Sequence, residues 1–341
     1  MNEPKDRYLN HLNAFKISLD KSFASSKENK LLSPGTALYY QDGRTPFFQL
    51  QGLARIDYKL GKGKDKKQAA IWLDEFKEIE DALGKYDYWV VMLENNKRWK
   101  FPKQFDDYFN QQINYQLGVM EERLLRFGWM KKENNQFVYS DQAFGELKKS
   151  LKKIEHHSSE KERKKLLSMF RDEVIEIHDK VKSKEIDLAN IEFGIHEFRR
   201  KIRWIGIYCS ALLGKVQIEK SGNKSPLKHF ITKERMSFKF NQLPINEVQK
   251  APVYYLQGGF YAMSDLIKII GEIKDPGLAT EEMLNISNLL GFDNSIVKKQ
   301  LGSEFYPHTK VVKDSKMIIN NFLFKENILV HIADHFDKQI K

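Results

Sequence analysis

The sequence predicts an all-α protein that is built from helix bundles. Apolar residues recur three or four positions apart over most of the chain, and this spacing places them on one face of a helix. No stretch of convincing length alternates apolar and polar residues at the two-residue period of a strand. The length of 341 residues suits two lobes of ordinary domain size better than a single core. We therefore expect an N-terminal helical bundle over residues 1–155 and a C-terminal helical bundle over residues 160–341.

The first bundle contains several segments with a clear apolar line. In residues 68–94, Trp72 and Leu83 fall on the same side of the expected helix. Gly84 lies inside this segment, where glycine costs about 1 kcal/mol relative to alanine, so we expect a close helix crossing or a bend there. Residues 128–139 have a mixed pattern and are expected to form a short irregular or hairpin segment. The helices expected in this bundle cover residues 8–19, 47–60, 68–94, 106–126 and 144–154.

The second bundle combines charged helices with one region that is poor in helical signals. Pro226, Pro244 and Pro252 interrupt residues 220–252, so this segment is predicted to be an irregular connection or insertion. The helices expected in this bundle cover residues 160–182, 195–212, 253–273, 280–301 and 316–336.

The helix over residues 195–212 has the most informative pattern. At an advance of about 100° per residue, one face is entirely apolar and is expected to be buried. The nearly opposite face, which we call the cationic face, places three arginines and one histidine within a wedge of roughly 100°. The apolar face consists of Ile195, Phe198, Ile202, Ile205, Cys209 and Leu212, and the cationic face consists of His196, Arg199, Arg200 and Arg203.

Two interpretations of the cationic face remain open. Like charges three or four positions apart repel by a few tenths of a kcal/mol, and only Glu192 and Glu197 lie near enough in sequence to neutralise them. In the functional interpretation, an external anion meets this face. In the structural interpretation, the face is solvated and pairs with acidic side chains from another helix.

The overall charge makes a polyanion the leading class of partner. Lys and Arg number 57 against 46 Asp and Glu, for a net charge of +11, which favours nucleic acid, an anionic membrane or a phosphate polymer. The single cysteine, Cys209, excludes an intramolecular disulfide and fits a reducing compartment. The most apolar run, residues 204–214, is too short to cross a bilayer, and residues 1–30 lack the apolar core of a signal peptide. We therefore expect a cytoplasmic protein without a membrane partner.

Two motifs resemble those of the CHAD family, the conserved histidine α-helical domain. The first is a helix that opens with histidine, continues with spaced Arg and Lys, and ends in apolar residues; here it runs from His196 to Tyr208. The second is Leu-Gly followed by an acid or amide, which occurs once in each half. Its two copies are Leu83-Gly84 with Asp87 and Leu290-Gly291 with Asp293 and Asn294.

The resemblance covers most of the chain, which would then be a single CHAD-like domain of two lobes. It implies two antiparallel four-helix bundles related by a pseudo-two-fold axis, and a basic groove that binds inorganic polyphosphate. The first half of the family usually has its own His-x-x-Arg helix, but the matching residues 50–59 lack the histidine and contain Asp57. Arg55 and Lys59 keep the basic positions, so the resemblance implies that they complete the site opposite the cationic face.

The predicted function is non-enzymatic binding of polyphosphate or a similar polyanion, without a cofactor. The alternatives are a nucleic-acid-binding protein that uses the same face, a phosphohydrolase and a helical interaction scaffold. No nucleophile–base spacing or carboxylate cluster supports catalysis. His331 and His335 have a spacing that is able to ligate one metal ion, but no third ligand is evident, so no metal site is predicted. The predicted binding residues are His196, Arg199, Arg200, Arg203, Arg55 and Lys59.

Overall fold

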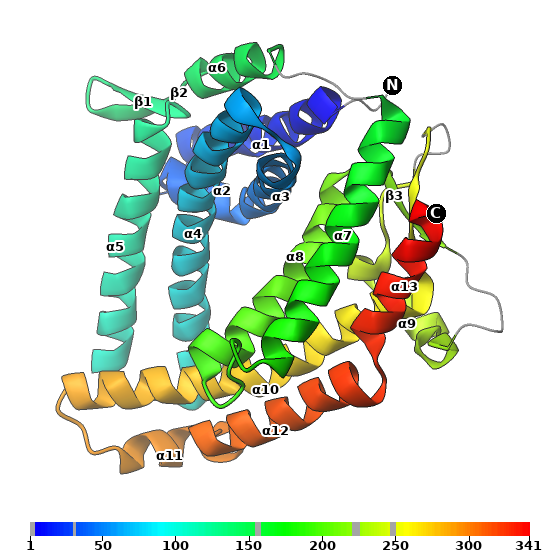
Figure 1. The fold of residues 1–341 in the computed structure, drawn as a ribbon. Coiled ribbons are helices and arrows are strands. Elements are labelled where there is room, and N and C mark those ends of the chain that lie inside the picture. The colour runs from blue at the N-terminus through cyan, green and yellow to red at the C-terminus, as the bar shows by residue number, and fades with distance from the viewer. Residues whose placement is uncertain (1–3, 30–31, 154–157, 220–225, 246–249) are drawn as a thin grey trace. The chain divides into compact units, whose positions relative to one another are not determined.

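The computed structural model describes residues 4–29, 32–153, 158–219, 226–245 and 250–341 (Figure 1). In these ranges the chain is predominantly helical, which confirms the all-α class. The chain divides into two compact units, Met1–His156 and His157–Lys341, which we call unit 1 and unit 2 and describe separately. The end of the expected helix 144–154, and residues 220–225 and 246–249 of the expected irregular segment, lie outside the described residues.

Unit 1 is built around the long helix α4, which packs against α3 and α5, while α1 packs against α2 and α3 (Figure 1). The rings of Phe15 of α1 and Phe47 of α3 are tilted by 57° with centroids 4.3 Å apart, and Trp129 packs edge-on against Phe15 with centroids 4.9 Å apart. Its elements are α1 (Pro4–Glu28), α2 (Pro34–Tyr40), α3 (Arg44–Leu60), α4 (Gly63–Trp99), α5 (Lys103–Arg126), β1 (Met130–Glu133), β2 (Gln136–Tyr139) and α6 (Gln142–Leu151).

The mixed segment 128–139 contains an antiparallel hairpin of β1 and β2. Asn134 and Asn135 connect the strands and adopt φ angles of 49° and 61°. Two consecutive residues with positive φ form the turn that matches the natural twist of a hairpin, and asparagine tolerates this conformation.

In unit 2, α7 packs against α8 and α13, and α10 packs against α8 and α12 (Figure 1). Its main elements are α7 (Ser159–Lys182), the π-helical turn η1 (Ile191–His196), α8 (Glu197–Ala211), β3 (Val216–Glu219), β4 (Val253–Leu256), α10 (Gln257–Leu289), α11 (Ser295–Leu301), α12 (His308–Asn320), the π-helical turn η5 (Asn321–Lys325) and α13 (Ile328–Ile340). The shorter elements are η2 (Lys228–Phe230), α9 (Lys233–Ser237), η3 (Lys239–Asn241) and η4 (Gly302–Glu304).

The prediction of a helix beginning at residue 253 was wrong at its start, because residues 253–256 form β4. This strand pairs in parallel with β3, in the register Val216↔Val253. Parallel strands need a long crossover, and the expected irregular segment supplies it. Four-residue strands are too short to show a reliable two-residue period, which explains why the sequence did not reveal them.

The predicted break between residues 273 and 280 was also wrong, because α10 continues through Pro276. Proline has no N–H to donate within a helix and usually interrupts it. Gly277 follows directly, and a Cβ at this position would lie 2.3 Å from Val311 Cγ2 of α12. The glycine therefore permits the close approach of α12 to α10.

A single helix over residues 316–336 was predicted, but the structure divides this region. α12 ends in η5, and α13 begins after Asn327, which has a φ of 49°. The left-handed conformation of Asn327 redirects the chain. α13 then packs against α7.

Candidate anion-binding site

The apolar face of α8 is buried as predicted. Each of its six members, Ile195, Phe198, Ile202, Ile205, Cys209 and Leu212, is no more than 1% exposed. Burial raises the pKa of the Cys209 thiol, so this cysteine is part of the core rather than a reactive group. The position of this face fixes the cationic face on the other side of the helix.

The turn η1 positions the start of the cationic face. The side chain of Asn190 accepts a hydrogen bond from the backbone N–H of Phe193 at 2.8 Å and caps the turn. A Cβ at Gly194 would lie 1.8 Å from the carbonyl oxygen of Asp187, so only glycine fits this close approach. His196 is the last residue of η1 and immediately precedes α8.

His196 is half-buried, and it is the titratable group of the candidate site. Its Nδ1 is buried and has no hydrogen-bond partner within the described part of the chain. Burial and the nearby charge of Lys274 lower the pKa of His196, with smaller effects of the same sign from Arg200 and Arg199, while Glu192 raises it. The imidazole is therefore neutral at pH 7 in the absence of a ligand.

Arg199 connects α8 to α10. Its Nε donates a hydrogen bond to the carbonyl oxygen of Ile267 at 2.9 Å. A Cβ at Gly271, one turn further along α10, would lie 2.9 Å from Arg199 Nη2. Gly271 therefore makes room for the guanidinium group, which is positioned by the backbone of α10 and still has other N–H donors.

Lys274 of α10 is a member of this cluster that the sequence did not reveal. Its side chain is only 4% exposed and pairs with Asp275 Oδ1 at 2.7 Å. A buried lysine is uncommon unless it is paired. It lies three residues after Gly271 and therefore about one helical turn from Arg199, but only the packing of α8 against α10 brings these groups together.

The other members of the cationic face differ in their surroundings. Arg200 is exposed and pairs with Glu197, its Nε donating to Oε2 at 2.8 Å. Lys201 lies 3.8 Å from the same carboxylate. Arg203 is partly buried. Arg200 is therefore paired with a carboxylate of its own helix and not, as the structural interpretation expected, with one from another helix, whereas Arg199 and His196 adjoin α10.

Arg55 and Lys59 belong to α3 of unit 1, where Arg55 is partly buried and Lys59 is exposed. Asp57, the acid between them, accepts a hydrogen bond from the hydroxyl of Tyr8 at 2.8 Å. Burial of Tyr8, followed by its contact with Asp57, raises the pKa of that phenol. Asp57 therefore has a structural role in joining α1 to α3, and the convergence of Arg55 and Lys59 with Arg199 stays a prediction.

The two Leu-Gly segments have different structures, so they do not support the pseudo-two-fold relation that the resemblance implies. Gly84 lies in the middle of α4, as expected for a close approach, because a Cβ there would lie 2.4 Å from Arg44 Nη2. Gly291 follows the end of α10 with a φ of 75°, and a Cβ there would meet nothing within 4 Å. Gly84 is an internal packing position, whereas Gly291 ends a helix.

Gly84 and Arg44 form an arrangement that resembles Gly271 and Arg199. Arg44 Nε donates to Glu80 Oε1 at 2.9 Å, and Arg44 Nη1 donates to Asp87 Oδ2 at 3.2 Å. The hydroxyl of Tyr39 also donates to Asp87, at 2.8 Å. In both units an arginine lies over a helical glycine, but two carboxylates engage Arg44, so we assign it a structural role.

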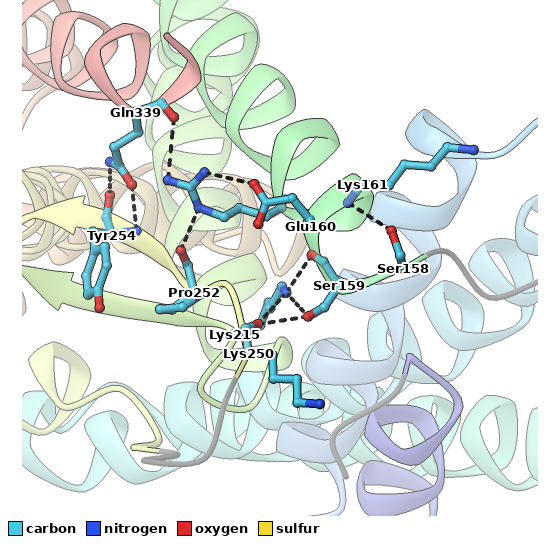
Figure 2. A network of polar contacts seen from close by, with 10 residues as sticks. Ser158, Ser159, Glu160, Lys161, Lys215, Lys250, Pro252, Tyr254 and Gln339 are labelled. Carbon is cyan, nitrogen blue, oxygen red and sulfur yellow. Dashed lines mark hydrogen bonds and ion pairs between the residues drawn. The ribbon is translucent and has the colours of Figure 1, made fainter.

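A second buried lysine, Lys215, has a structural role as well (Figure 2). Its side chain is 0% exposed, and Nζ donates to the carbonyl oxygen and Oγ of Ser159 at 3.1 and 2.9 Å and to the carbonyl oxygen of Lys250 at 3.0 Å. Glu162 Oε2 lies 3.4 Å away. These contacts join the start of α7 to both ends of the crossover and leave no donor for a ligand.

No group of three or more metal-ligating side chains occurs among the described residues. His335 Nε2 lies 3.2 Å from the carbonyl oxygen of Tyr254 and 3.2 Å from Glu219 Oε2. Gln339 binds both backbone groups of Tyr254, accepting from its N–H at 3.0 Å and donating to its carbonyl at 2.7 Å (Figure 2). His335 therefore helps to hold α13 on the edge of β4.

No family model, curated protein or solved structure matches this chain. Membership of the CHAD family stays a prediction from the motifs. In the described part of the chain, no helix combines the length and apolar character needed to cross a membrane.

Proposed function

We propose that the chain binds inorganic polyphosphate, or a similar polyanion, through the cationic face of α8. The observation that carries this proposal is the grouping of His196, Arg199 and Lys274 where α8 packs against α10. The three groups come from two helices, and Asp275 pairs with Lys274. The net charge of +11 adds a long-range attraction for a polyanion.

Each group has a distinct part in this proposal. Arg199, oriented by its bond to Ile267, gives a planar set of donors for phosphate oxygens. Lys274, which is 4% exposed and paired with Asp275, adds positive charge beside the ligand rather than a direct contact. The negative charge of the ligand raises the pKa of His196, so the imidazole takes up a proton. The charged His196 is then a second hydrogen-bond donor beside Arg199. Arg200 and Arg203 extend the surface along α8.

The CHAD resemblance adds finer features to the proposal. Two antiparallel four-helix bundles related by a pseudo-two-fold axis would give the ligand a second set of cations, which we assign to Arg55 and Lys59. Because the first-half histidine is absent, this second set would contribute charge without a titrating group. The role is one of binding alone, so incubation of the protein with polyphosphate and magnesium is expected to release no phosphate.

The replacement of Arg199 and Arg203 together by alanine tests the proposal. Hydrogen bonds to charged groups contribute about 1.5–3 kcal/mol each, so we expect affinity for polyphosphate of defined length to fall by about tenfold or more. Isothermal titration calorimetry at low salt measures the change. Because Arg199 also joins α8 to α10, the thermal unfolding of the variant is recorded in parallel, and Arg203→Ala alone serves as a second variant.

The matched control replaces Lys77 and Lys103 of unit 1, which pair with Asp81 and Asp107 at 2.5 and 2.8 Å. The Lys77→Ala/Lys103→Ala variant loses the same net charge and should bind within about twofold of the parent, because paired surface charges contribute little. A folded Arg199→Ala/Arg203→Ala variant that binds polyphosphate as tightly as the parent would overturn the site. Preferential binding of RNA in competition with polyphosphate of equal charge would favour the nucleic-acid alternative.

A further inference from the structure

Three exposed lysines form a row along α12 of unit 2. Lys310, Lys313 and Lys316 are all exposed, and no ion pair to a carboxylate engages any of them within the described part of the chain. Asp314, the one acidic residue of this helix, accepts a hydrogen bond from the hydroxyl of Tyr306. Lys310 lies over the ring of the same tyrosine, 4.4 Å from its centroid. The helix therefore carries three exposed lysines against one carboxylate, and that carboxylate forms an ion pair with none of them within the described part of the chain.

The packing of α12 fixes the direction of this row. Val311, Ser315 and Ile319 are 0% exposed and form the buried line of the helix. At about 100° per residue, the three lysines lie roughly 100° to 160° from the centre of that line. Val311 packs directly against Gly277 of α10, so α12 lies close to α10. The lysines are consequently presented on the outer side of a firmly packed helix.

The helix that carries the row packs against elements of the candidate site. α12 packs against η1, the turn that ends at His196, and runs beside α10, the helix that supplies Lys274 (Figure 1). Successive lysines are about 4.5 Å apart along the helix axis, at a rise of about 1.5 Å per residue. The cationic face and the lysines of α12 therefore belong to the same unit, on helices that pack against shared neighbours.

We propose that Lys310, Lys313 and Lys316 form a second binding surface for inorganic polyphosphate, continuous with the cationic face of α8. The inference rests on the proposed function for its ligand and adds residues that neither the motifs nor the resemblance indicated. Lysines recognise charge rather than base edges. Met317 is the one large apolar side chain that α12 exposes. The helix thus lacks the exposed aromatic rings on which single-stranded nucleic acids stack.

The test replaces all three lysines by glutamine, which is a good helix former. Polyphosphate binding is measured by calorimetry over a range of salt concentrations. Each neutralised phosphate contributes about 0.7 to the slope of log K against log salt for a flexible strand. We expect Lys310→Gln/Lys313→Gln/Lys316→Gln to have a slope that is shallower by about 2, and at least tenfold weaker binding at low salt.

The control is Lys77→Gln/Lys97→Gln/Lys103→Gln, which removes the same charge from lysines of unit 1 that pair with Asp81, Glu94 and Asp107. It is expected to keep the slope of the parent. If the α12 variant binds like the parent, or if the control weakens binding equally, the second surface is wrong while the α8 site stands. If the parent itself does not bind polyphosphate, both the proposed function and this surface are overturned. Tighter binding of duplex DNA than of polyphosphate at equal salt would also contradict the proposed polyphosphate surface on α12.

Discussion

We expect His196 to make ligand binding at the candidate site depend on pH. In the free protein, burial and Lys274 lower the pKa of its imidazole. A bound polyanion adds negative charge and raises that pKa, so binding is accompanied by the uptake of a proton. By linkage, affinity then increases as the pH falls through the interval between the raised pKa of the complex and the lowered pKa of the free protein.

We therefore expect polyphosphate to bind more tightly at pH 6 than at pH 7.5, by several-fold. Replacement of His196 by glutamine should remove most of this difference, because glutamine keeps a polar group but does not titrate. Calorimetry in two buffers of different ionisation enthalpy measures the proton uptake directly. Equal proton uptake by the parent and His196→Gln would show that another group is responsible.

The helices show which parts of the fold a sequence is able to predict. Long amphipathic segments were recognised because their periodic apolar faces are local signals, and α8 is the clearest example. The continuation of α10 through Pro276, in the part of the helix that packs against α12, has no such local signal. Lys274 was missed for the same reason, since its proximity to His196 follows from helix packing and not from spacing in the chain.

The packing of α12 on α10 gives a prediction at the scale of elements. Gly277→Ala would place a Cβ 2.3 Å from Val311 Cγ2, and overpacking of this kind typically costs about 1–3 kcal/mol. We expect the free energy of unfolding, measured with a chemical denaturant, to decrease. Gly206→Ala in α8 is the control, because nothing lies within 4 Å of its Cβ position and the better helix propensity should add up to about 1 kcal/mol. A gain in stability for both variants would contradict the close packing of α12 on α10 at Gly277.

For the whole molecule, the composition predicts a polyanion as the class of ligand, and the binding surface that we propose for it lies on unit 2. A net charge of +11 is a property of the entire chain, and most of the cations that contribute to it do not help to locate a site. The cations that narrow the choice of site are those with a defined neighbour, such as Arg199 at Ile267, and those that no carboxylate pairs with among the described residues, such as Lys313. Neither distinction is visible before the helices are packed.

The salt dependence of polyphosphate binding by the unmodified protein tests the central claim most directly. The three arginines of the cationic face of α8 and the three lysines of α12, at about 0.7 each, predict that log K falls against log salt with a slope of about −4. Calorimetric titrations between low and physiological salt give this slope. A value near −4 supports an extended surface of phosphate contacts, whereas the absence of binding at low salt, or a slope near zero, would contradict the account.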